Sequence, residues 1–203
     1  METEIIPIVE ELIDKTFQVL KEVYQNQCEG KGEFSSNCDS RIVFPQYRED
    51  GKIRVSEQEL RFVFVEQFNQ IAQEKDLYYS VETPTRWRYK GFASGNPEPA
   101  KNEKEKNTRS GEFDMTIFDQ MGNRICLIEF KAHNVKDANF EKDFVKLNNS
   151  NEGEDVGAYF VLLLEGCDDG TIKSVKEKIS EYKDRTHIKC FALKSDDSKV
   201  ITL

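Results

Sequence analysis

Three residues of types that support metal-dependent chemistry lie close together in the sequence. Asp114 lies in a run of β-forming residues at 112–118, and Glu129 and Lys131 lie in a second such run at 125–132. The connection between the two runs contains a glycine, which predicts a β-hairpin. In the register that this turn favours, Asp114 lies directly opposite Glu129.

This register would bring two carboxylates and an amine together. Opposed residues of a hairpin have Cβ atoms about 5 Å apart and project on the same face, and the strand period of two adds Lys131 to that face. Two carboxylates this close repel each other, and a divalent cation is the natural compensation. Oxygen ligands suit Mg²⁺ or Mn²⁺, which polarise a phosphoryl oxygen and acidify a bound water. Lys131 would then orient that water or stabilise charge on the phosphorus.

A second interpretation is that the cluster is a solvated sheet face, since Asp, Glu and Lys often pair across exposed strands. The neighbouring residues argue against this interpretation. Ile125, Leu127, Ile128 and Phe130 make the second strand apolar on both faces. Charged residues within such a strand are not expected to be surface decoration.

The residues at 128–131 (Ile-Glu-Phe-Lys), preceded by Asp114 on the strand before, resemble the motif of the PD-(D/E)xK, or restriction-endonuclease-like, nucleases. The resemblance implies that Asp114 and Glu129 bind the metal and that Lys131 assists catalysis. One departure is that Phe113 stands where the family motif has a proline, which many members also lack.

The family often adds a glutamate from the first core helix, which is expected to start near Ser56. Ser56 and Glu59 fit a capping box, which already explains Glu59. Glu57 lies three and seven residues before Leu60 and Phe64, so it is expected to point with the buried face. We therefore expect Glu57 to be a further metal ligand, directly or through water. The alternative is that Glu57 is a first-turn acid favoured by the helix dipole.

A basic segment precedes the hairpin. Arg86, Arg88 and Lys90 alternate with Trp87 and Tyr89, a pattern suited to phosphates and stacked bases. We interpret the segment as a loop that contacts nucleic acid, and a solvated excursion of the chain is the alternative.

Other charged residues have simpler explanations. Lys142 and Lys146 could reach a backbone phosphate, but a solvated helix face that pairs with Glu141 and Asp143 explains them as well. His133 falls on the face of Glu129 and is expected to be an ordinary histidine at the end of a strand.

The hydrophobic periodicity predicts the elements that would position these residues. Helices are expected at about 1–24, 56–74, 140–147 and 172–179, and strands at 77–83 (ended by Pro84), 112–118, 125–132, 158–164, 188–193 and 200–203. A short stretch at 42–44 could pair as a further strand. The order predicts an α/β sandwich, with antiparallel strands first and a crossover helix later. The resemblance implies a restriction-endonuclease-like three-layer sandwich with a mixed central sheet, formed by residues 56–203 behind a helical and irregular extension at 1–55.

Composition limits the class of protein. The 203 residues suffice for one domain. The longest apolar run, at 159–164, is too short to cross a bilayer. The sequence shows no export signal and no CxxC pairing among its five cysteines, so reduced thiols in a cytoplasm are expected. The net charge of -9 counts against general nucleic-acid binding, although the local field at a groove matters more.

Together these observations predict a Mg²⁺-dependent nuclease that hydrolyses phosphodiester bonds of nucleic acid, with DNA as the expected substrate and water as the nucleophile. The alternative is a catalytically inactive module of the same fold that binds nucleic acid or a protein partner. Lys131 favours the enzyme, and the acidic total charge favours the module. The resemblance also allows a homodimer, although nothing in the sequence marks a dimer face. A third interpretation, an α/β interaction protein with a coincidental motif, would be favoured if Asp114 and Glu129 lay far apart.

Overall fold

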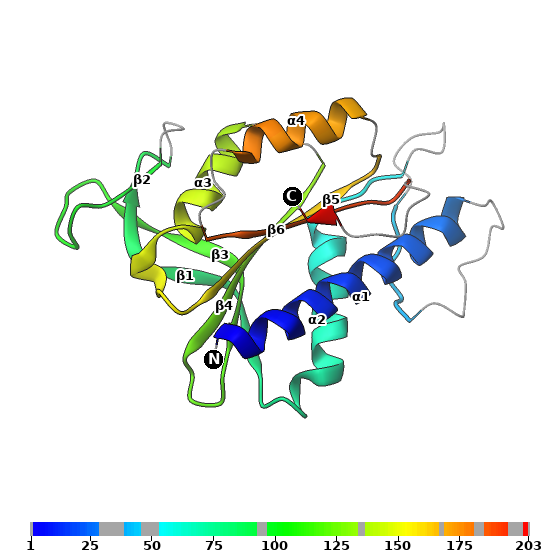
Figure 1. Cartoon of the computed structure of the whole chain (residues 1–203), viewed down its shortest axis with the longest axis horizontal. Coiled ribbons are helices and arrows are strands. Elements are labelled where there is room, and N and C mark those ends of the chain that lie inside the picture. The colour runs from blue at the N-terminus through cyan, green and yellow to red at the C-terminus, as the bar shows by residue number, and fades with distance from the viewer. Residues whose placement is uncertain are drawn as a thin grey trace.

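In the computed structural model, a mixed β-sheet forms the central layer of the molecule (Figure 1). The structure describes residues 2–28, 39–45, 53–92, 97–133, 137–166, 169–180, 185–194 and 201–202. In this part of the chain the sheet has seven strands, in the order β2-β1-β3-β4-β5-β6-β7. Their bounds are β1 Tyr78–Lys90, β2 Glu98–Pro99, β3 Arg109–Phe118, β4 Arg124–Ala132, β5 Gly157–Leu164, β6 His187–Ala192 and β7 Ile201–Thr202.

The strand directions follow the predicted order. Strands β1 to β4 pair antiparallel, β4, β5 and β6 pair parallel, and β7 returns antiparallel to β6. Every residue of β5 is buried, as expected for a parallel strand covered on both faces.

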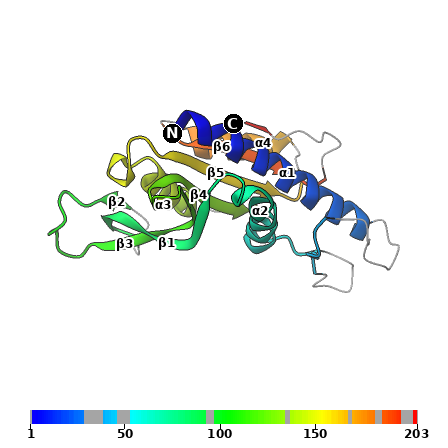
Figure 2. The same cartoon turned by 90° about the horizontal axis from the view of Figure 1, so that it is seen from below.

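Helices cover both faces of the sheet, which gives three layers (Figure 2). Helices α1 (Glu2–Cys28) and α2 (Glu57–Ala72) share one hydrophobic cluster with the sheet, and α3 (Asp137–Leu147) and α4 (Asp169–Ile179) share the other. A short 3₁₀ helix, η1 (Ser150–Glu152), links α3 to β5. The predicted α/β sandwich is therefore confirmed.

Helix α1 belongs to the core and is more than an extension. Its apolar stripe is buried against α2 and the sheet, and Phe17 stacks on Phe191 of β6 with ring centroids 4.9 Å apart. The described part of the following connection, 39–45, has no regular structure, so the strand expected at 42–44 is absent there. Phe44 of that stretch is nevertheless buried in the same core.

The end of β1 was predicted wrongly. The strand was expected to stop before Pro84, but it continues to Lys90 and pairs Pro84 with Glu112. The register shifts between Pro84 and Arg88, and a proline is tolerated at such an irregularity and wherever its nitrogen lacks a ladder partner. The basic residues that follow Pro84 are therefore strand residues.

Within the described part of the chain, none of the helices combines the length and the apolarity that crossing a bilayer requires.

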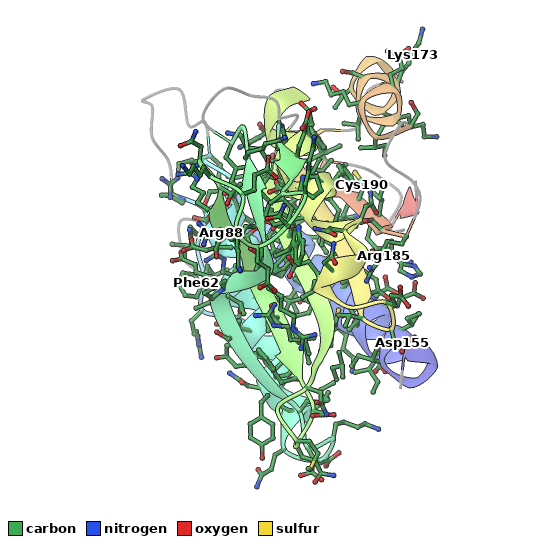
Figure 3. The ribbon with its side chains drawn as sticks, turned by 90° about the vertical axis from the view of Figure 1, so that its left-hand side faces the viewer. Phe62, Arg88, Asp155, Lys173, Arg185 and Cys190 are labelled. Carbon is green, nitrogen blue, oxygen red and sulfur yellow. The ribbon has the colours of Figure 1, made fainter. Side chains whose placement is uncertain are left out.

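Truncating Phe17 tests whether α1 is part of the core. We expect Phe17→Ala to lower the free energy of unfolding by about 3–5 kcal/mol, because it leaves a cavity against Phe191. Phe62→Ala is the matched control, since Phe62 lies on α2 with 56% of its side chain exposed (Figure 3), and it should change stability by about 0.5 kcal/mol or less. Equal urea unfolding midpoints for the two variants would show that α1 docks only loosely.

Candidate active site

The hairpin of β3 and β4 has the register that the sequence predicts. Met115 pairs with Ile128, and the pairs continue in step toward the turn until a bulge near its end. The backbone pairing ends at Met115 and Ile128, one residue before Asp114 and Glu129. The Asp114 carboxylate accepts a hydrogen bond of 2.8 Å from the backbone N–H of Phe130. The Asp114 carboxylate thus accepts a hydrogen bond that a backbone carbonyl of a paired strand would otherwise accept, and this bond fixes its orientation.

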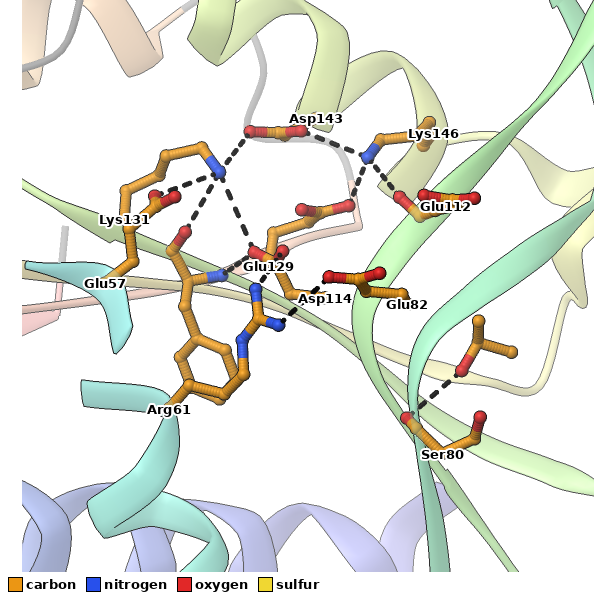
Figure 4. A network of polar contacts seen from close by, with 12 residues as sticks. Glu57, Arg61, Ser80, Glu82, Glu112, Asp114, Glu129, Lys131, Asp143 and Lys146 are labelled. Atoms are coloured by element: carbon orange, nitrogen blue, oxygen red, sulfur yellow. Dashed lines mark hydrogen bonds and ion pairs between the residues drawn. The ribbon is translucent and has the colours of Figure 1, made fainter. Parts of the chain in front are cut away.

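Lys131 reaches the centre of the site from β4 (Figure 4). Its Nζ lies 3.1 Å from a carboxylate oxygen of Asp143, 3.4 Å from one of Glu57 and 3.7 Å from one of Asp114. It also donates to the backbone carbonyl of Phe130 at 2.9 Å. Lys131 therefore binds carboxylates from three separate elements.

The charge state of Lys131 follows from these contacts. Burial by itself would lower the pKa of Lys131, but the surrounding carboxylates, first of all Asp143 and Asp114, raise it above the ordinary value. The amine therefore stays protonated. It can donate hydrogen bonds and stabilise negative charge.

Glu129 is the most deeply buried acid of the site, with 2% of its surface exposed. Burial, and then the neighbouring Asp143, raise the pKa of Glu129 well above its ordinary value, against the opposing effect of Lys146. The Nζ of Lys146 donates to Glu129 and to the carbonyl of Glu112, the latter at 2.7 Å. Glu129 is thus held by a lysine from α3, which the sequence did not predict.

Asp143 links the two lysines. Its carboxylate oxygens lie 3.1 Å from Lys131 Nζ and 3.1 Å from Lys146 Nζ, so it stands between them (Figure 4). The prediction that Lys146 and Asp143 form a solvated helix face is wrong, because both are buried. Each lies one residue before a buried apolar residue, Phe144 or Leu147. This position at the flank of the apolar stripe is a signal that sequence reasoning missed.

Arg61 binds Asp114, the carboxylate of the motif that lies on β3. Its Nη2 donates to Asp114 Oδ1 at 2.9 Å, and its Nη1 lies 3.7 Å from Glu82. Arg61 stands four residues after Glu57 on α2, so both belong to one helix face. Glu82 has a φ of 49°, which is uncommon for a residue with a side chain. The strained residue therefore lies next to the candidate site.

Glu57 lies at the site but is not buried. It is the first residue of α2, and its side chain is 40% exposed while it pairs with Lys131. Ser56 is the helix N-cap, as expected, but the predicted capping box does not form. The Ser56 hydroxyl instead donates to the Glu59 carboxylate, which also pairs with Arg54 at 3.5 Å.

The basic segment lies beside this cluster on β1 and has partners of its own. Arg88 donates to Thr108, and Lys90 pairs with Glu98 at 3.1 Å and with Glu105 at 3.4 Å. The interpretation of Arg86, Arg88 and Lys90 as loop residues is wrong, because they lie on a paired strand. A role for them in nucleic-acid binding stays a prediction.

Glu152 is a second buried carboxylate that sequence reasoning missed. It has no exposed surface and accepts hydrogen bonds from the backbone N–H groups of Arg86 and Trp87, at 2.7 and 2.9 Å. The Tyr89 hydroxyl donates to it at 2.8 Å. Burial, followed by the charge of Glu152, raises the pKa of Tyr89, so the phenol remains a donor. Glu152 thereby fixes β1 where it passes the site.

His133 has a structural position. It directly follows β4 and has a φ of 66°, and its Nε2 lies 2.6 Å from the backbone carbonyl of Val55. This contact agrees with the expected histidine at a strand end.

Two cavities open on either side of Asp143. One has a volume of about 340 Å³ and the other about 370 Å³. The first is lined by Phe92, Arg109, Ser110, Gly111, Glu112, Lys142, Asp143 and Lys146, and the second by Ser56, Glu57, Lys131, Ala132, His133, Lys142 and Asp143. Both cavities therefore meet the buried charge cluster.

The donor set fits a hard divalent cation in charge and in chemistry. Five carboxylates, of Glu57, Glu82, Asp114, Glu129 and Asp143, face three cations, of Arg61, Lys131 and Lys146, in the network. The surplus negative charge matches Mg²⁺ or Mn²⁺, which prefer carboxylate oxygens and water. Among the described residues, however, no three His, Cys, Asp or Glu side chains are arranged to hold a metal ion by themselves. Arg61 binds the Asp114 carboxylate and Lys146 binds the Glu129 carboxylate. A metal ion would therefore share these carboxylates with the two side chains or displace them.

Comparisons of the chain with protein-family models, with curated proteins and with solved structures give no match.

Removing Lys146 tests the charge balance of the buried cluster. We expect Lys146→Met to lower the free energy of unfolding by about 3–5 kcal/mol, because it leaves the Glu129 carboxylate buried without its closest cation. Adding Glu129→Gln to the same chain should restore a large part of that loss, since it removes the orphaned charge. Urea unfolding measures both changes.

The control is Lys173→Met on α4, whose pair with Glu177 is exposed and is worth about 0.5 kcal/mol or less. A Lys146→Met variant as stable as this control would contradict the assignment of Lys146 as the counter-charge of Glu129.

Proposed function

We propose that this protein is a metal-dependent nuclease of the PD-(D/E)xK type, which hydrolyses phosphodiester bonds of nucleic acid, with DNA as the expected substrate. The observation that carries the proposal is the convergence of Asp114 with Lys131 and Glu129 from neighbouring strands. A coincidental motif would not require two neighbouring strands to aim these side chains at one cluster. The three-layer arrangement, with α2 before the β1, β3 and β4 meander, agrees with a restriction-endonuclease-like core.

Asp114 and Glu129 would hold Mg²⁺ or Mn²⁺, and Glu57 would contribute directly or through water. When bound, the metal polarises a phosphoryl oxygen and lowers the pKa of a bound water. Lys131 keeps its proton and donates hydrogen bonds toward the attacking water or the developing charge on the phosphate. Asp143 positions Lys131, because it binds the amine at 3.1 Å from the α3 side.

A second candidate, an inactive module of the same fold, is favoured by the ion pairs of the site. Asp114 is bound to Arg61, and Glu129 is bound to Lys146. If these pairs persist in the presence of metal, the carboxylates are structural and the protein acts by binding alone. Metal titration separates the two candidates.

Metal binding should depend on Asp114. We expect calorimetric titration with Mn²⁺ to give one binding isotherm for the unchanged protein and none, or one at least tenfold weaker, for Asp114→Asn. The amide keeps the size of the side chain but removes its charge. Plasmid nicking by the same samples should be lost in parallel.

The control is Asp155→Asn, at an exposed turn position (Figure 3). It should behave as the unchanged protein in both assays. No Mn²⁺ binding to the unchanged protein would refute the metal site and return Asp114 and Glu129 to a structural role.

Lys131→Met should separate metal binding from catalysis. The variant loses the donor that stabilises phosphate charge, so we expect the cleavage rate to fall by about 10²-fold or more. The Mn²⁺ affinity should stay within about tenfold of the original, because both carboxylate ligands remain. Cleavage at the original rate would exclude Lys131 from the chemistry.

A further inference from the structure

The two cavities beside Asp143 are small. Their volumes of about 340 and 370 Å³ lie near the lower limit, about 300 Å³, of pockets that enclose small ligands. Each therefore suits a group of the size of one nucleotide. Because Lys142 and Asp143 line both cavities, a chain of nucleotides that fills both must cross these two residues.

The first cavity carries cations that the folded chain does not neutralise. Within the described residues, Arg109 and Lys142 form no ion pair, whereas Lys146 in the same wall is paired with Glu129. Unpaired cations next to a buried acidic cluster suit a phosphate group. Lys142 lies where the two cavities meet, so it can contact a phosphate that joins two nucleotides.

Phe92 is the aromatic residue that lines the same cavity, and the buried Tyr89 supports it from behind. The rings of Tyr89 and Phe92 stack with centroids 5.4 Å apart, and the guanidinium carbon of Arg109 lies 5.6 Å from the Phe92 ring. Glu152 anchors Tyr89 through its hydroxyl. The Phe92 ring thus supports the planar guanidinium of Arg109. Nucleobases stack on guanidinium planes of this kind.

Gly111 keeps this cavity open. A Cβ atom at residue 111 would lie 3.0 Å from the Lys146 Cδ and 3.1 Å from the Phe92 ring. A larger residue would press on both walls of the cavity. Strand β3, which carries Asp114, therefore has a glycine at the position where a larger side chain would fill part of the cavity.

We propose that this site takes a single unpaired strand of nucleic acid, with one nucleotide against Arg109 and Phe92 and the next beside Glu57 and Lys131. The connecting phosphate lies by Lys142 and the charge cluster. The proposal rests on the nuclease function proposed above and adds the strandedness of the substrate.

A duplex fits these features poorly. Its bases are paired and stacked, and moving one into a cavity of this size costs a few kcal/mol of unpairing. A duplex also brings two strands of phosphates toward a chain with a net charge of -9 and toward Glu57 and Glu112 at the openings of the cavities. A single strand brings about half of that charge per unit length.

Fluorescence anisotropy with a labelled 12-nucleotide DNA strand and with its duplex tests the inference. Ca²⁺ replaces Mg²⁺, since it also binds carboxylates. We expect the single strand to bind at least tenfold more tightly. Equal or tighter binding of the duplex, or binding of neither, would overturn the inference. An RNA strand of the same sequence identifies the preferred sugar, and tight binding of either strand supports the inference.

Variants of the cavity locate the binding. Arg109→Ala and Lys142→Ala should each weaken single-strand binding about three- to tenfold and reduce the salt dependence of log K by about 0.7, the value of one phosphate contact on a single strand. Lys173→Ala, a matched cation that projects from α4 (Figure 3), should leave both unchanged. No effect of either cavity variant would refute the assigned path.

Because binding is measured separately from cleavage, the two proposals fail in different ways. A protein that binds Mn²⁺ and cuts duplex but prefers no single strand would keep the nuclease function and lose this inference. A protein that prefers the single strand but never cuts would keep the binding path and lose the nuclease.

Discussion

The burial of the Glu129 carboxylate is the constraint on which the site depends. Two more acids, Asp143 and Asp114, lie close enough to raise its pKa further. The ionised form of a carboxylate in such surroundings needs a cation in direct contact. Lys146 supplies that cation from α3, so this helix must pack against β4 at one position along its length. The apolar stripe of α3, which includes Phe140 and Phe144, and this ion pair therefore specify the same docking.

The two lysines of the site have different surroundings. Lys146 is bonded to a buried carboxylate and to a backbone carbonyl, so its charge is used within the fold. Lys131 is held at longer distances by Asp143, Glu57 and Asp114, and it lines an open cavity. A protonated amine with several loose carboxylate partners can exchange one of them for a substrate oxygen or a water. This difference is the physical reason why we propose Lys131, and not Lys146, for the catalytic role.

Glu152 is a second buried carboxylate, and its hydrogen bonds hold the neighbouring strand β1 in place. Two backbone N–H groups and the Tyr89 hydroxyl satisfy a carboxylate with no solvent contact. These donors bind both carboxylate oxygens of Glu152, and Arg124 adds an ion pair at 3.5 Å. The irregular part of β1 is thereby held to η1, and Tyr89 of this strand stacks on Phe92, which lines one cavity beside the charge cluster.

The sequence by itself determined most of the helices and strands and the register of the β3 and β4 hairpin. The β3 and β4 hairpin was predictable because its turn and its alternation act between near neighbours, and the apolar run of β5 identified a strand buried on both faces. Glu57 was expected at this site from its helical spacing to Leu60 and Phe64 and from the resemblance, and it does pair with Lys131, although its side chain stays 40% exposed and does not turn into the core. The end of β1 was not, because a proline stops a strand only where its nitrogen needs a partner, and that depends on the neighbouring strand.

Only the tertiary structure decided which charges meet. Arg61, Asp143 and Lys146 come from two helices on opposite faces of the sheet, and no spacing along the chain relates them to Asp114 or Glu129. When each helix is considered alone, these charged side chains are expected to face solvent. The packing of α2 and α3 around one end of the hairpin turns them inward, because a buried carboxylate pair is stable only when cations from other elements reach it.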